Sequence, residues 1–339
     1  MKTKYLSKVL RECLDTSRFV NVFITSACTC KCIMCDFWRK GQSYMLDETF
    51  RDVVERLESL GFYNFSLTGG EPLLHPEYFD FVRFLNRKGL YVNSPTNGTL
   101  LSEKNVLKLK EAGLDSIFVS IDSLNPKIAD YVRQHPGQLN KALKGLKLLK
   151  KHGIPRAAIL VLSKYNIDYF AKMIVELDEQ YDAPSVLCFP DLGVGPLDEI
   201  VWDRSENLEQ SLMPPVGEDK LIKIIDELLY LKKSGYRLFN AAEYLLDVKR
   251  AYLKQHRQIP CYGGYYVLNV DWNGYVAPCF NKQAICHIKD LTKNSLKKTP
   301  CFECVNQCFI ELSYISECMA KKHFWKVLDS WSTIFKAFH

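Results

Sequence analysis

The sequence lacks any run of about eighteen uninterrupted apolar residues, the length that a membrane-spanning helix needs, so it predicts no transmembrane segment. Charged residues interrupt every apolar run near the N-terminus, which argues against a secretory signal, and we expect a cytoplasmic protein. The net charge of +6 is small for 339 residues, and the Lys and Arg residues are scattered. Scattered charges are typical of solvated helix faces, so we expect no nucleic-acid partner. Residues 323–339 are amphipathic if helical; we expect them to pack on the body, with peripheral membrane contact as the alternative.

Cysteine, in contrast, is abundant, because the chain has thirteen. Without a secretory signal these thiols should stay reduced, which favours metal binding or catalysis over disulfides. Cys13 and Cys188 stand alone in the sequence and are expected to be small buried hydrophobes. The others form two groups: Cys28, Cys30, Cys32 and Cys35 near the start, and Cys261, Cys279, Cys286, Cys301, Cys304, Cys308 and Cys318 near the end.

Between residues 19 and 235 short β-rich runs alternate with helical patterns. This alternation predicts a parallel sheet with helices outside it. Six such units are fewer than the eight of a closed barrel, so we expect an α/β fold built on a partial (β/α)6 TIM-like barrel. The expected strands are 19–25, 64–68, 91–96, 116–121, 157–162 and 185–189, with helices such as 47–60, 77–89 and 102–113 between them.

The pattern changes after residue 235. A helical connection, 240–256, leads to a stretch that predicts a β-hairpin of strands 265–270 and 275–279 around Gly274. We therefore expect a small Cys-rich β-hairpin domain on the C-terminal side of the barrel. The predicted organisation is an N-terminal helix at 1–18, the barrel core at 19–235, a helical linker at 236–260, the Cys-rich domain at 261–310 and a C-terminal helix at 311–339.

Polar or glycine-bearing segments follow each expected strand. The first cysteine group follows strand one, and TGGEP, residues 68–72, follows strand two. Because the carboxyl ends of parallel strands meet at one edge of the sheet, these segments are expected to share one active site. The later segments are TNGT at 96–99, SIDS at 120–123, SKYN at 163–166 and PDLGVG at 190–195.

The first cysteine group has the spacing of an iron–sulfur site. Three and then two residues separate Cys28, Cys32 and Cys35, so one short loop could hold three irons of a 4Fe–4S cluster. Three cysteines would leave the fourth iron open to a ligand. Zinc is the alternative, although structural zinc sites usually draw on two separated pairs of ligands. Cys30 is interpreted as a non-ligand.

This spacing after the first strand of a β/α barrel resembles the radical S-adenosylmethionine (radical SAM) superfamily. In that family the open iron chelates SAM, and the reduced cluster cleaves SAM to a 5′-deoxyadenosyl radical that abstracts a substrate hydrogen. The resemblance implies a SAM-binding 4Fe–4S cluster on these three cysteines and an electron donor such as flavodoxin or ferredoxin. The residue before the last cysteine is often aromatic in the family but is Met34 here, so Phe37 and Trp38 are expected to supply apolar surface for the cofactor.

Companion motifs strengthen the resemblance. Thr68-Gly69-Gly70-Glu71-Pro72 resembles the family's glycine-rich stretch, whose backbone and carboxylate groups accept hydrogen bonds from the methionyl ammonium of SAM. The resemblance also assigns Thr96 and Asn97 to the polar end of strand three, Ser120 and Asp122 to the ribose hydroxyls, Arg133 to the cofactor carboxylate and Asn166 to adenine or ribose. A surface salt bridge is the alternative role for Arg133.

The second cysteine group resembles the SPASM/twitch extension, which carries auxiliary 4Fe–4S clusters in a large radical SAM subgroup. Its hairpin pattern of cysteine, glycine and cysteine is matched by Cys261, Gly274 and Cys279. Two auxiliary clusters need eight thiolates and this region offers seven, so we expect one cluster. Its predicted ligands are Cys261, Cys279, Cys301 and Cys304, with Cys286, Cys308 and Cys318 as alternates, and a zinc ribbon is the alternative site.

The predicted function is radical-based C–H activation of an unidentified small molecule, lipid-linked metabolite or peptide. Net oxidation or bond formation, assisted by the auxiliary cluster, is the expected outcome. A peptide-maturing radical SAM enzyme is the alternative within enzymes, and a non-catalytic iron–sulfur electron-transfer protein is the alternative outside them. Asp191, Glu243 and Tyr244 are candidates for substrate contacts or a general base.

Overall fold

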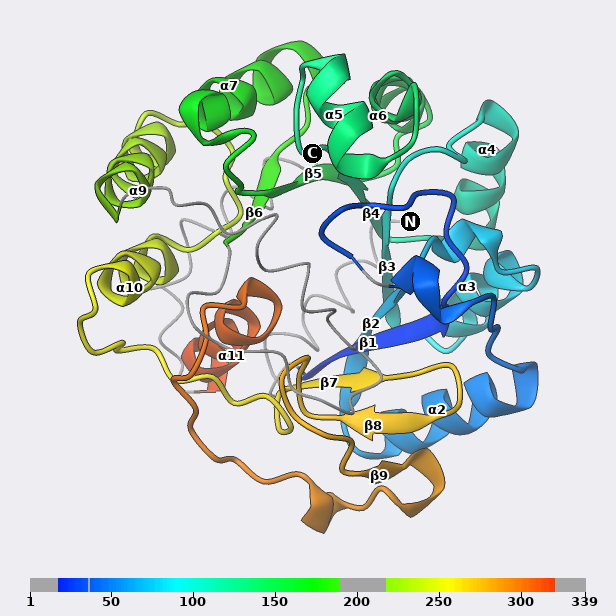
Figure 1. Ribbon diagram of the computed structural model, residues 1–339. Helices are drawn as coiled ribbons and strands as arrows, with labels where there is room; N and C mark the ends of the chain where they lie inside the picture. The colour runs from blue at the N-terminus through cyan, green and yellow to red at the C-terminus, as the bar shows by residue number, and fades with distance from the viewer. Residues whose placement is uncertain (1–17, 36, 190–217, 321–339) are drawn as a thin grey trace.

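The computed structural model describes residues 18–35, 37–189 and 218–320. One curved sheet runs through this part of the molecule as an open arc, with helices along its outer side (Figure 1). The strands are β1 (Arg18–Thr25), β2 (Phe62–Gly69), β3 (Tyr91–Thr96), β4 (Ser116–Ser120), β5 (Arg156–Val161), β6 (Ser185–Cys188), β7 (Val267–Val270), β8 (Tyr275–Ala277) and β9 (Cys286–His287). The α-helices are α2 (Asp47–Ser59), α3 (Tyr78–Arg87), α4 (Glu103–Ala112), α5 (Pro126–Arg133), α6 (Gln138–Lys151), α7 (Phe170–Tyr181), α9 (Glu218–Lys233), α10 (Ala242–Tyr252) and α11 (Gln307–Ala320).

The sheet has the strand order β6-β5-β4-β3-β2-β1-β7-β8-β9. Each of the first six strands pairs in parallel with its neighbour in sequence, and at least one helix connects each pair. This confirms the predicted partial (β/α)6 TIM-like barrel. Each predicted strand agrees with an observed one to within two residues at either end.

The strands of the barrel have two unlike faces. In β1 the side chains of Val20, Val22 and Ile24 are fully buried in the main hydrophobic core, whereas Asn21 between them is only half-buried. Asn21 pairs in register with Ser66 of β2, which is also half-buried. Because successive side chains of a strand point to opposite faces, Val20, Val22 and Ile24 face the helices, whereas Asn21 lies on the inner face together with Phe23.

The loops after β3 and β4, which carry predicted site residues, each end at a helix N-cap. Ser102 is the N-cap of α4 and accepts a hydrogen bond from Asn105 N at 3.3 Å. Asn125 caps α5 by accepting from Lys127 N at 3.0 Å, with Pro126 at the first helical position. These caps satisfy N–H groups that the helix leaves without partners. They also fix where the loops after β3 and β4 end.

The predicted hairpin is formed by β7 and β8, which pair antiparallel. Asp271 organises its turn, since the carboxylate accepts from Asn273 N at 3.0 Å and from Tyr275 N at 2.7 Å. Gly274 adopts a φ of +87°, a conformation that favours glycine. β7 also pairs in parallel with β1, so the hairpin extends the barrel sheet and holds the Cys-rich segment beside the first strand. The domain boundaries stay predictions.

Some sequence-based predictions lie outside the described residues. They are Cys13 and nearly all of the N-terminal helix, the PDLGVG segment with Asp191, and residues 321–339 of the C-terminal helix. The described start of that last helix is α11, which already begins at Gln307. In the part of the chain that the structure describes, no helix is both long and apolar enough to cross a membrane.

Candidate active site

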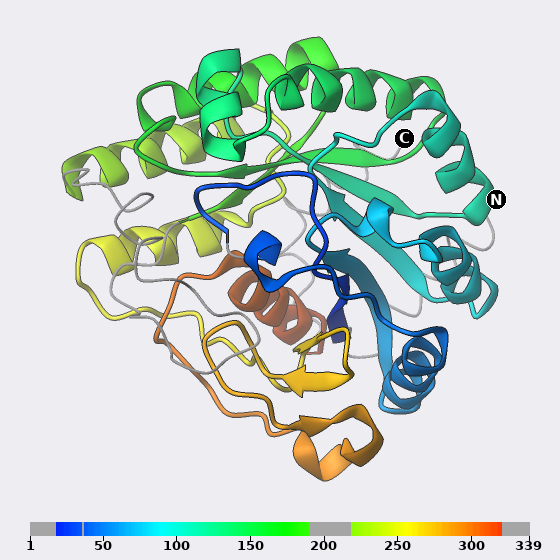
Figure 2. The same ribbon diagram turned by 45° about the vertical axis from the view of Figure 1, so that its right-hand side comes forward.

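The loop after β1 holds the first cysteine group and folds back across the open side of the arc, where it is dark blue (Figure 2). A hydrogen bond joins the two ends of this loop, because the Thr25 hydroxyl donates to Ser43 O at 2.7 Å. Further along, Ile33 N donates to Val132 O of α5 at 3.0 Å. The loop is therefore tied both to its own strand and to the helix that follows β4.

Two thiols of this loop receive hydrogen bonds from neighbouring groups. Cys28 Sγ accepts from Cys30 N at 3.4 Å and from Asn97 Nδ2 at 3.7 Å, and Cys32 Sγ accepts from Arg133 Nη1 at 3.8 Å. A hydrogen bond from the Cys30 thiol is the largest cause that lowers the pKa of Cys28, and it also lowers the pKa of Cys32 to about 7. These contacts favour the thiolate, which is the form that binds a metal.

Cys30 and Cys35 behave differently from those two thiols. Cys30 is buried, and its pKa is raised chiefly by the hydrogen bonds that its own thiol donates to Cys28 and Cys32. Burial raises the pKa of Cys35 to about 12 in the metal-free chain. Cys30 is thus a protonated donor to its neighbours, in line with its interpretation as a non-ligand. The assignment of the other three cysteines as iron ligands stays a prediction.

The TGGEP segment packs against the cysteine loop through its backbone. A Cβ atom on Gly69 would lie 2.1 Å from Thr25 O, and one on Gly70 would lie 2.3 Å from Ala27 O. Gly70 N donates to Thr25 O at 2.9 Å, and Glu71 N donates to Ala27 O at 2.8 Å. Only glycine permits so close an approach of two backbones. The two motifs consequently form one structural unit.

The Glu71 carboxylate is fully buried and braces the ends of β2 and β3. It accepts from Thr96 Oγ1 at 2.8 Å, from Asn97 N at 2.8 Å and from Leu73 N at 3.3 Å. Burial raises the pKa of Glu71 to about 7 in spite of these donors. Pro72 is buried as well and starts the short helix η2 (Pro72–Leu74). What this segment leaves half-buried is the pair of glycines rather than the carboxylate.

Asn97 links the end of β3 to the cysteine loop, because its Nδ2 group donates to Thr29 Oγ1 at 2.9 Å as well as to the first thiol. A residue that the sequence did not single out supports it. Gln138, at the start of α6, donates from Nε2 to Asn97 O at 2.6 Å and to Ser120 O at 3.2 Å. Gln138 thereby holds the ends of β3 and β4 together. A lone glutamine in a basic helix belongs to no motif, so only the structure identifies it.

Asp122 and Arg133 lie against each other as a buried ion pair, with 2.6 Å between Oδ2 and Nε. Asp122 Oδ1 accepts from Val161 N at 3.3 Å, and Asn166 Nδ2 donates to Asp122 O at 2.9 Å. Ser120 is half-buried at the end of the same strand. The residues predicted for ribose, carboxylate and adenine are thus brought together as a mutually bonded network. The ion pair of Arg133 is internal, unlike the surface salt bridge considered as an alternative.

Phe37 belongs to an aromatic cluster between the two cysteine groups. Its ring stacks on Phe23 of β1 with 5.2 Å between centroids, and it meets Trp272 of the β7–β8 turn edge-on at 6.2 Å. Phe280 also contacts Phe23, at 6.0 Å. Thr68 is half-buried beside Phe23 in the neighbouring strand. Phe37 therefore joins the cysteine loop to the hairpin, and its contact with the cofactor stays a prediction.

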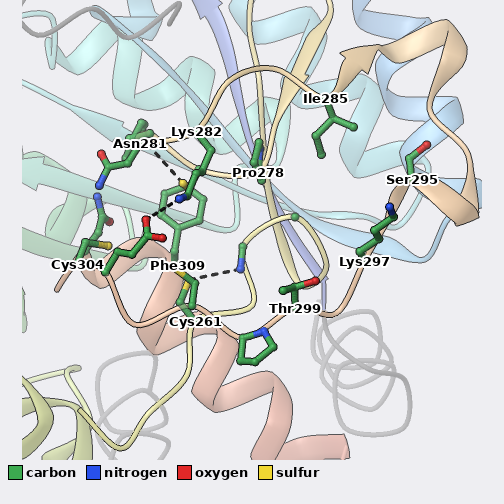
Figure 3. A pocket seen from close by; sticks show the side chains of 18 of the residues that line it. Cys261, Pro278, Asn281, Lys282, Ile285, Ser295, Lys297, Thr299, Cys304 and Phe309 are labelled. Atoms are coloured by element: carbon green, nitrogen blue, oxygen red, sulfur yellow. Dashed lines mark hydrogen bonds and ion pairs between the residues drawn. The ribbon is translucent and has the colours of Figure 1, made fainter. Parts of the chain in front are cut away.

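The second cysteine group lines a cavity of about 760 Å³. In Figure 3, Cys261 and Cys304 lie on one side of it, and Ile285 and Lys297 lie on the other. Cys261 and Cys301 exchange two backbone hydrogen bonds, each of 2.9 Å. All four predicted ligands and one alternate line this cavity: Cys261, Cys279, Cys286, Cys301 and Cys304.

Backbone donors reach the auxiliary thiols in the same way as they reach the first group. Cys261 Sγ accepts from Gly263 N at 3.3 Å, and Cys279 Sγ accepts from Asn281 N at 3.4 Å. Cys308 and Cys318 do not line the cavity, so Cys286 is the alternate that the geometry favours. Cys308 lies instead near Cys188 at the end of β6. Among the described residues, no three His, Cys, Asp or Glu side chains surround a single metal-ion position.

The candidate residues on α10 have different surroundings. Tyr244 is fully buried and its hydroxyl donates to Val305 O at 2.8 Å, so it supports the loop after Cys304. Its role as a substrate contact or general base stays a prediction. Glu243 is half-buried on the same helix. Further along α10, Asp247 forms a buried ion pair with Arg257, which the sequence did not indicate.

Residues 22–177 match the sequence model of the Radical SAM superfamily. This part of the chain is similar to the radical SAM superfamily. The AdoMet-dependent heme synthase of Methanosarcina barkeri (strain Fusaro / DSM 804) is 31% identical over 165 residues, which are 47% of this chain and 46% of that relative. The AdoMet-dependent heme synthase of Oleidesulfovibrio alaskensis (strain ATCC BAA-1058 / DSM 17464 / G20) is 23% identical over 181 residues, 52% of this chain and 46% of the relative. The chain thus spans about half the length of the curated relatives it matches.

Solved structures share the fold. Native anSMEcpe with bound AdoMet and Cp18Cys peptide has a TM-score of 0.60 at 21% identity, and the match covers 87% of this chain and 83% of that one. Streptococcus suis SuiB bound to S-adenosylmethionine has a TM-score of 0.64 at 12% identity, with 86% and 68% covered. At these identities the likeness shows the fold alone.

The residues present fit the cofactors that the radical SAM domain implies. Cys28, Cys32 and Cys35 offer soft thiols from one loop, and the Gly69-Gly70 backbone lies directly against that loop. Arg133 and Asn97 supply hydrogen bonds to sulfur, a known means by which a protein tunes an iron–sulfur cluster. The cavity in the second group likewise has a thiol-rich lining, which suits an iron–sulfur cluster.

Proposed function

We propose that this chain is a radical SAM enzyme that cleaves SAM reductively and uses the resulting 5′-deoxyadenosyl radical to abstract a hydrogen from its substrate. The observation that carries the proposal is the backbone contact between the glycine-rich segment and the cysteine loop, within a domain that matches the superfamily. Cys28, Cys32 and Cys35 would hold the SAM-binding 4Fe–4S cluster. Cys261, Cys279, Cys301 and Cys304 would hold one auxiliary 4Fe–4S cluster, with Cys286 as the alternate ligand.

When bound and reduced, the first cluster supplies the electron for SAM cleavage. The chain's own residues prepare the site for it. Asn97 and Arg133 donate hydrogen bonds to two of the thiols and hold them in place. The backbone of Gly69 and Gly70, half-buried beside the loop, is the part of its motif that can accept from the methionyl ammonium. The half-buried Ser120 is the strand-four group open to a ribose hydroxyl.

The substrate proposal stays broad: a small molecule, a lipid-linked metabolite or a peptide, converted by net oxidation or bond formation. A peptide is the second, narrower candidate, because anSMEcpe has been solved with a peptide and SuiB with its precursor peptide SuiA. Both share the fold of this chain, with TM-scores of 0.60 and 0.61. An electron donor such as flavodoxin or ferredoxin completes the proposal, because the reduction must come from a partner.

The test is anaerobic formation of 5′-deoxyadenosine from SAM by reconstituted, dithionite-reduced protein. Cys32→Ala should abolish the product, because it removes a proposed ligand. Cys30→Ala is the control from the same loop: it removes a hydrogen-bond donor to two thiols but no proposed ligand, so it should keep the iron and still form the product. SAM binding is measured in parallel by equilibrium dialysis. Iron-loaded wild-type protein that neither binds SAM nor forms the product would favour the electron-transfer alternative.

A further inference from the structure

Arg257 and Asp247 form a buried ion pair outside the cysteine motifs. The distance between Arg257 Nε and Asp247 Oδ2 is 3.0 Å, and Arg257 is only 6% exposed while Asp247 is fully buried. Removing two charges from water is costly, so a buried pair is weak evidence for stability on its own. The role of the pair is therefore inferred from the hydrogen bonds that its remaining atoms make, which are Nη1 and Nη2 of Arg257 and Oδ1 of Asp247.

Those outer atoms contact the segments that carry two auxiliary cysteines. Arg257 Nη1 donates to Cys304 O, and Nη2 donates to Ile259 O at 2.8 Å. On the other side, Asp247 Oδ1 accepts from Gln258 N at 2.5 Å and from Ile259 N at 3.3 Å. The pair consequently ties α10 to the stretch that enters Cys261 and to the backbone of Cys304 itself.

Other hydrogen bonds also hold the segments that carry these cysteines. Cys261 is held to Cys301 by two backbone hydrogen bonds, and Tyr244 of α10 holds Val305 directly after Cys304. The sulfur atoms of Cys261 and Cys279 receive backbone donors, and Cys304 has its carbonyl fixed by Arg257. Arg257, Asp247 and Tyr244 do not line the cavity themselves, but they contact the backbone of the segments whose thiols do.

We propose that Arg257, oriented by Asp247, is a positioning residue for the auxiliary cluster and sets the separation of Cys261 and Cys304. This inference rests on the proposed function, because it requires that cluster. A guanidinium carries its donors in a rigid planar fork, so it can bond two carbonyls and a carboxylate at once. A lysine at this position keeps the charge opposite Asp247 but cannot span Cys304 O and Ile259 O together.

The experiment isolates the auxiliary cluster in the full-length variant Cys28→Ala/Cys32→Ala/Cys35→Ala, which lacks the first set of ligands. This parent should bind about four irons per chain after anaerobic reconstitution, as one cubane cluster requires. Adding Arg257→Lys should at least halve the iron, or change the EPR spectrum and midpoint potential of the cluster that remains. Adding Arg156→Lys is the matched control, because Arg156 is also buried and bonds Asp182 far along the chain from the cavity residues.

The outcomes distinguish a failure of the positioning role of Arg257 from a failure of the proposed auxiliary cluster. A parent that binds no iron overturns the auxiliary cluster, and the positioning role with it. A parent with full iron, joined by an Arg257→Lys variant with the same iron, EPR spectrum and potential, overturns only the positioning role. Equal loss in Arg156→Lys would do so too, since the effect would be general destabilisation. If Arg257→Lys fails to fold by circular dichroism, Asp247→Asn repeats the test, because it removes the charge that orients Arg257, together with the longer ion pair of 3.7 Å to Arg250.

Discussion

Arg133 and Asp122 meet in an internal ion pair of 2.6 Å directly beside the Cys32 thiol, which accepts a hydrogen bond from the same guanidinium. Asp122 comes from the end of β4 and Arg133 from the last turn of α5. The pair therefore connects the strand ends to the cysteine loop. The resemblance assigns these two residues to different parts of SAM. In the structure they share one role, which is to hold the end of β4 and α5 together beside Cys32.

Arg133→Gln should destabilise the protein, because it leaves Asp122 buried without its counter-ion. Loss of one partner of a buried pair costs about 3–5 kcal/mol, which guanidinium unfolding followed by circular dichroism can measure. The double variant Asp122→Asn/Arg133→Gln should regain much of this stability, since neither charge remains. SAM affinity, measured by equilibrium dialysis, should stay low in both variants. Wild-type affinity in the double variant would contradict a role of this pair in the SAM site.

Gly70→Ala should separate the glycine-rich segment from the cysteine loop. Its Cβ would lie 2.3 Å from Ala27 O and 2.6 Å from Ser26 O, and both are backbone atoms that cannot swing away. We expect loss of iron from the first cluster and of 5′-deoxyadenosine formation, measured by iron assay and chromatography. Gly89→Ala is the control: a φ of +74° strains alanine there, but its Cβ meets nothing within 4 Å, so iron and product should be kept. Retention of iron and product in Gly70→Ala would show that the contact is not needed.

Cys261→Ala and Cys308→Ala should have opposite effects on iron content. Cys261 lines the cavity of the second group and Cys308 does not. Reconstituted Cys261→Ala should lose the auxiliary iron, about half of the total for two cubane clusters, whereas Cys308→Ala should keep it. Iron assays and Mössbauer spectra test both variants. Wild-type iron in Cys261→Ala, or halved iron in Cys308→Ala, would refute the ligand assignment.

Glu311 should make stability depend on pH. Burial raises its pKa to about 7, although Asn240 and Gln307 donate to its carboxylate. Between the ordinary carboxyl pKa of about 4.3 and about 7, the folded chain keeps a proton that the unfolded chain has released, so stability falls as the pH rises.

Glu311→Gln cannot ionise, so its stability relative to wild type should be greater at pH 8 than at pH 5, by about 3 kcal/mol. Guanidinium unfolding at the two pH values measures this difference. Glu55→Gln, at an exposed position, is the control and should show none. If the stability difference between Glu311→Gln and wild type were the same at both pH values, the raised pKa of Glu311 would be contradicted.

The barrel could be predicted because the hydrophobicity of its strands and helices varies with a regular local period. Every second residue of β1, from Val20 to Ile24, is buried under the helices, and burial on one face is what makes a strand visible in a sequence. The hairpin was visible for a similar reason, since Gly274 provides the turn. The parallel pairing of β7 with β1 was not, because it joins segments more than 240 residues apart and no local pattern encodes a partner at that distance.

The sequence by itself determined which groups could bind iron, because a thiol is chemically unlike its neighbours and the spacing of Cys28, Cys32 and Cys35 is a local property. It also placed the glycine-rich segment at the end of the second strand. Only the tertiary structure decided which residues hold these motifs in place. Gln138 and Arg257 act through hydrogen bonds to backbone carbonyls, and every residue has a carbonyl. Such contacts leave no signature in a sequence, since they depend on the distance that folding creates between the two groups.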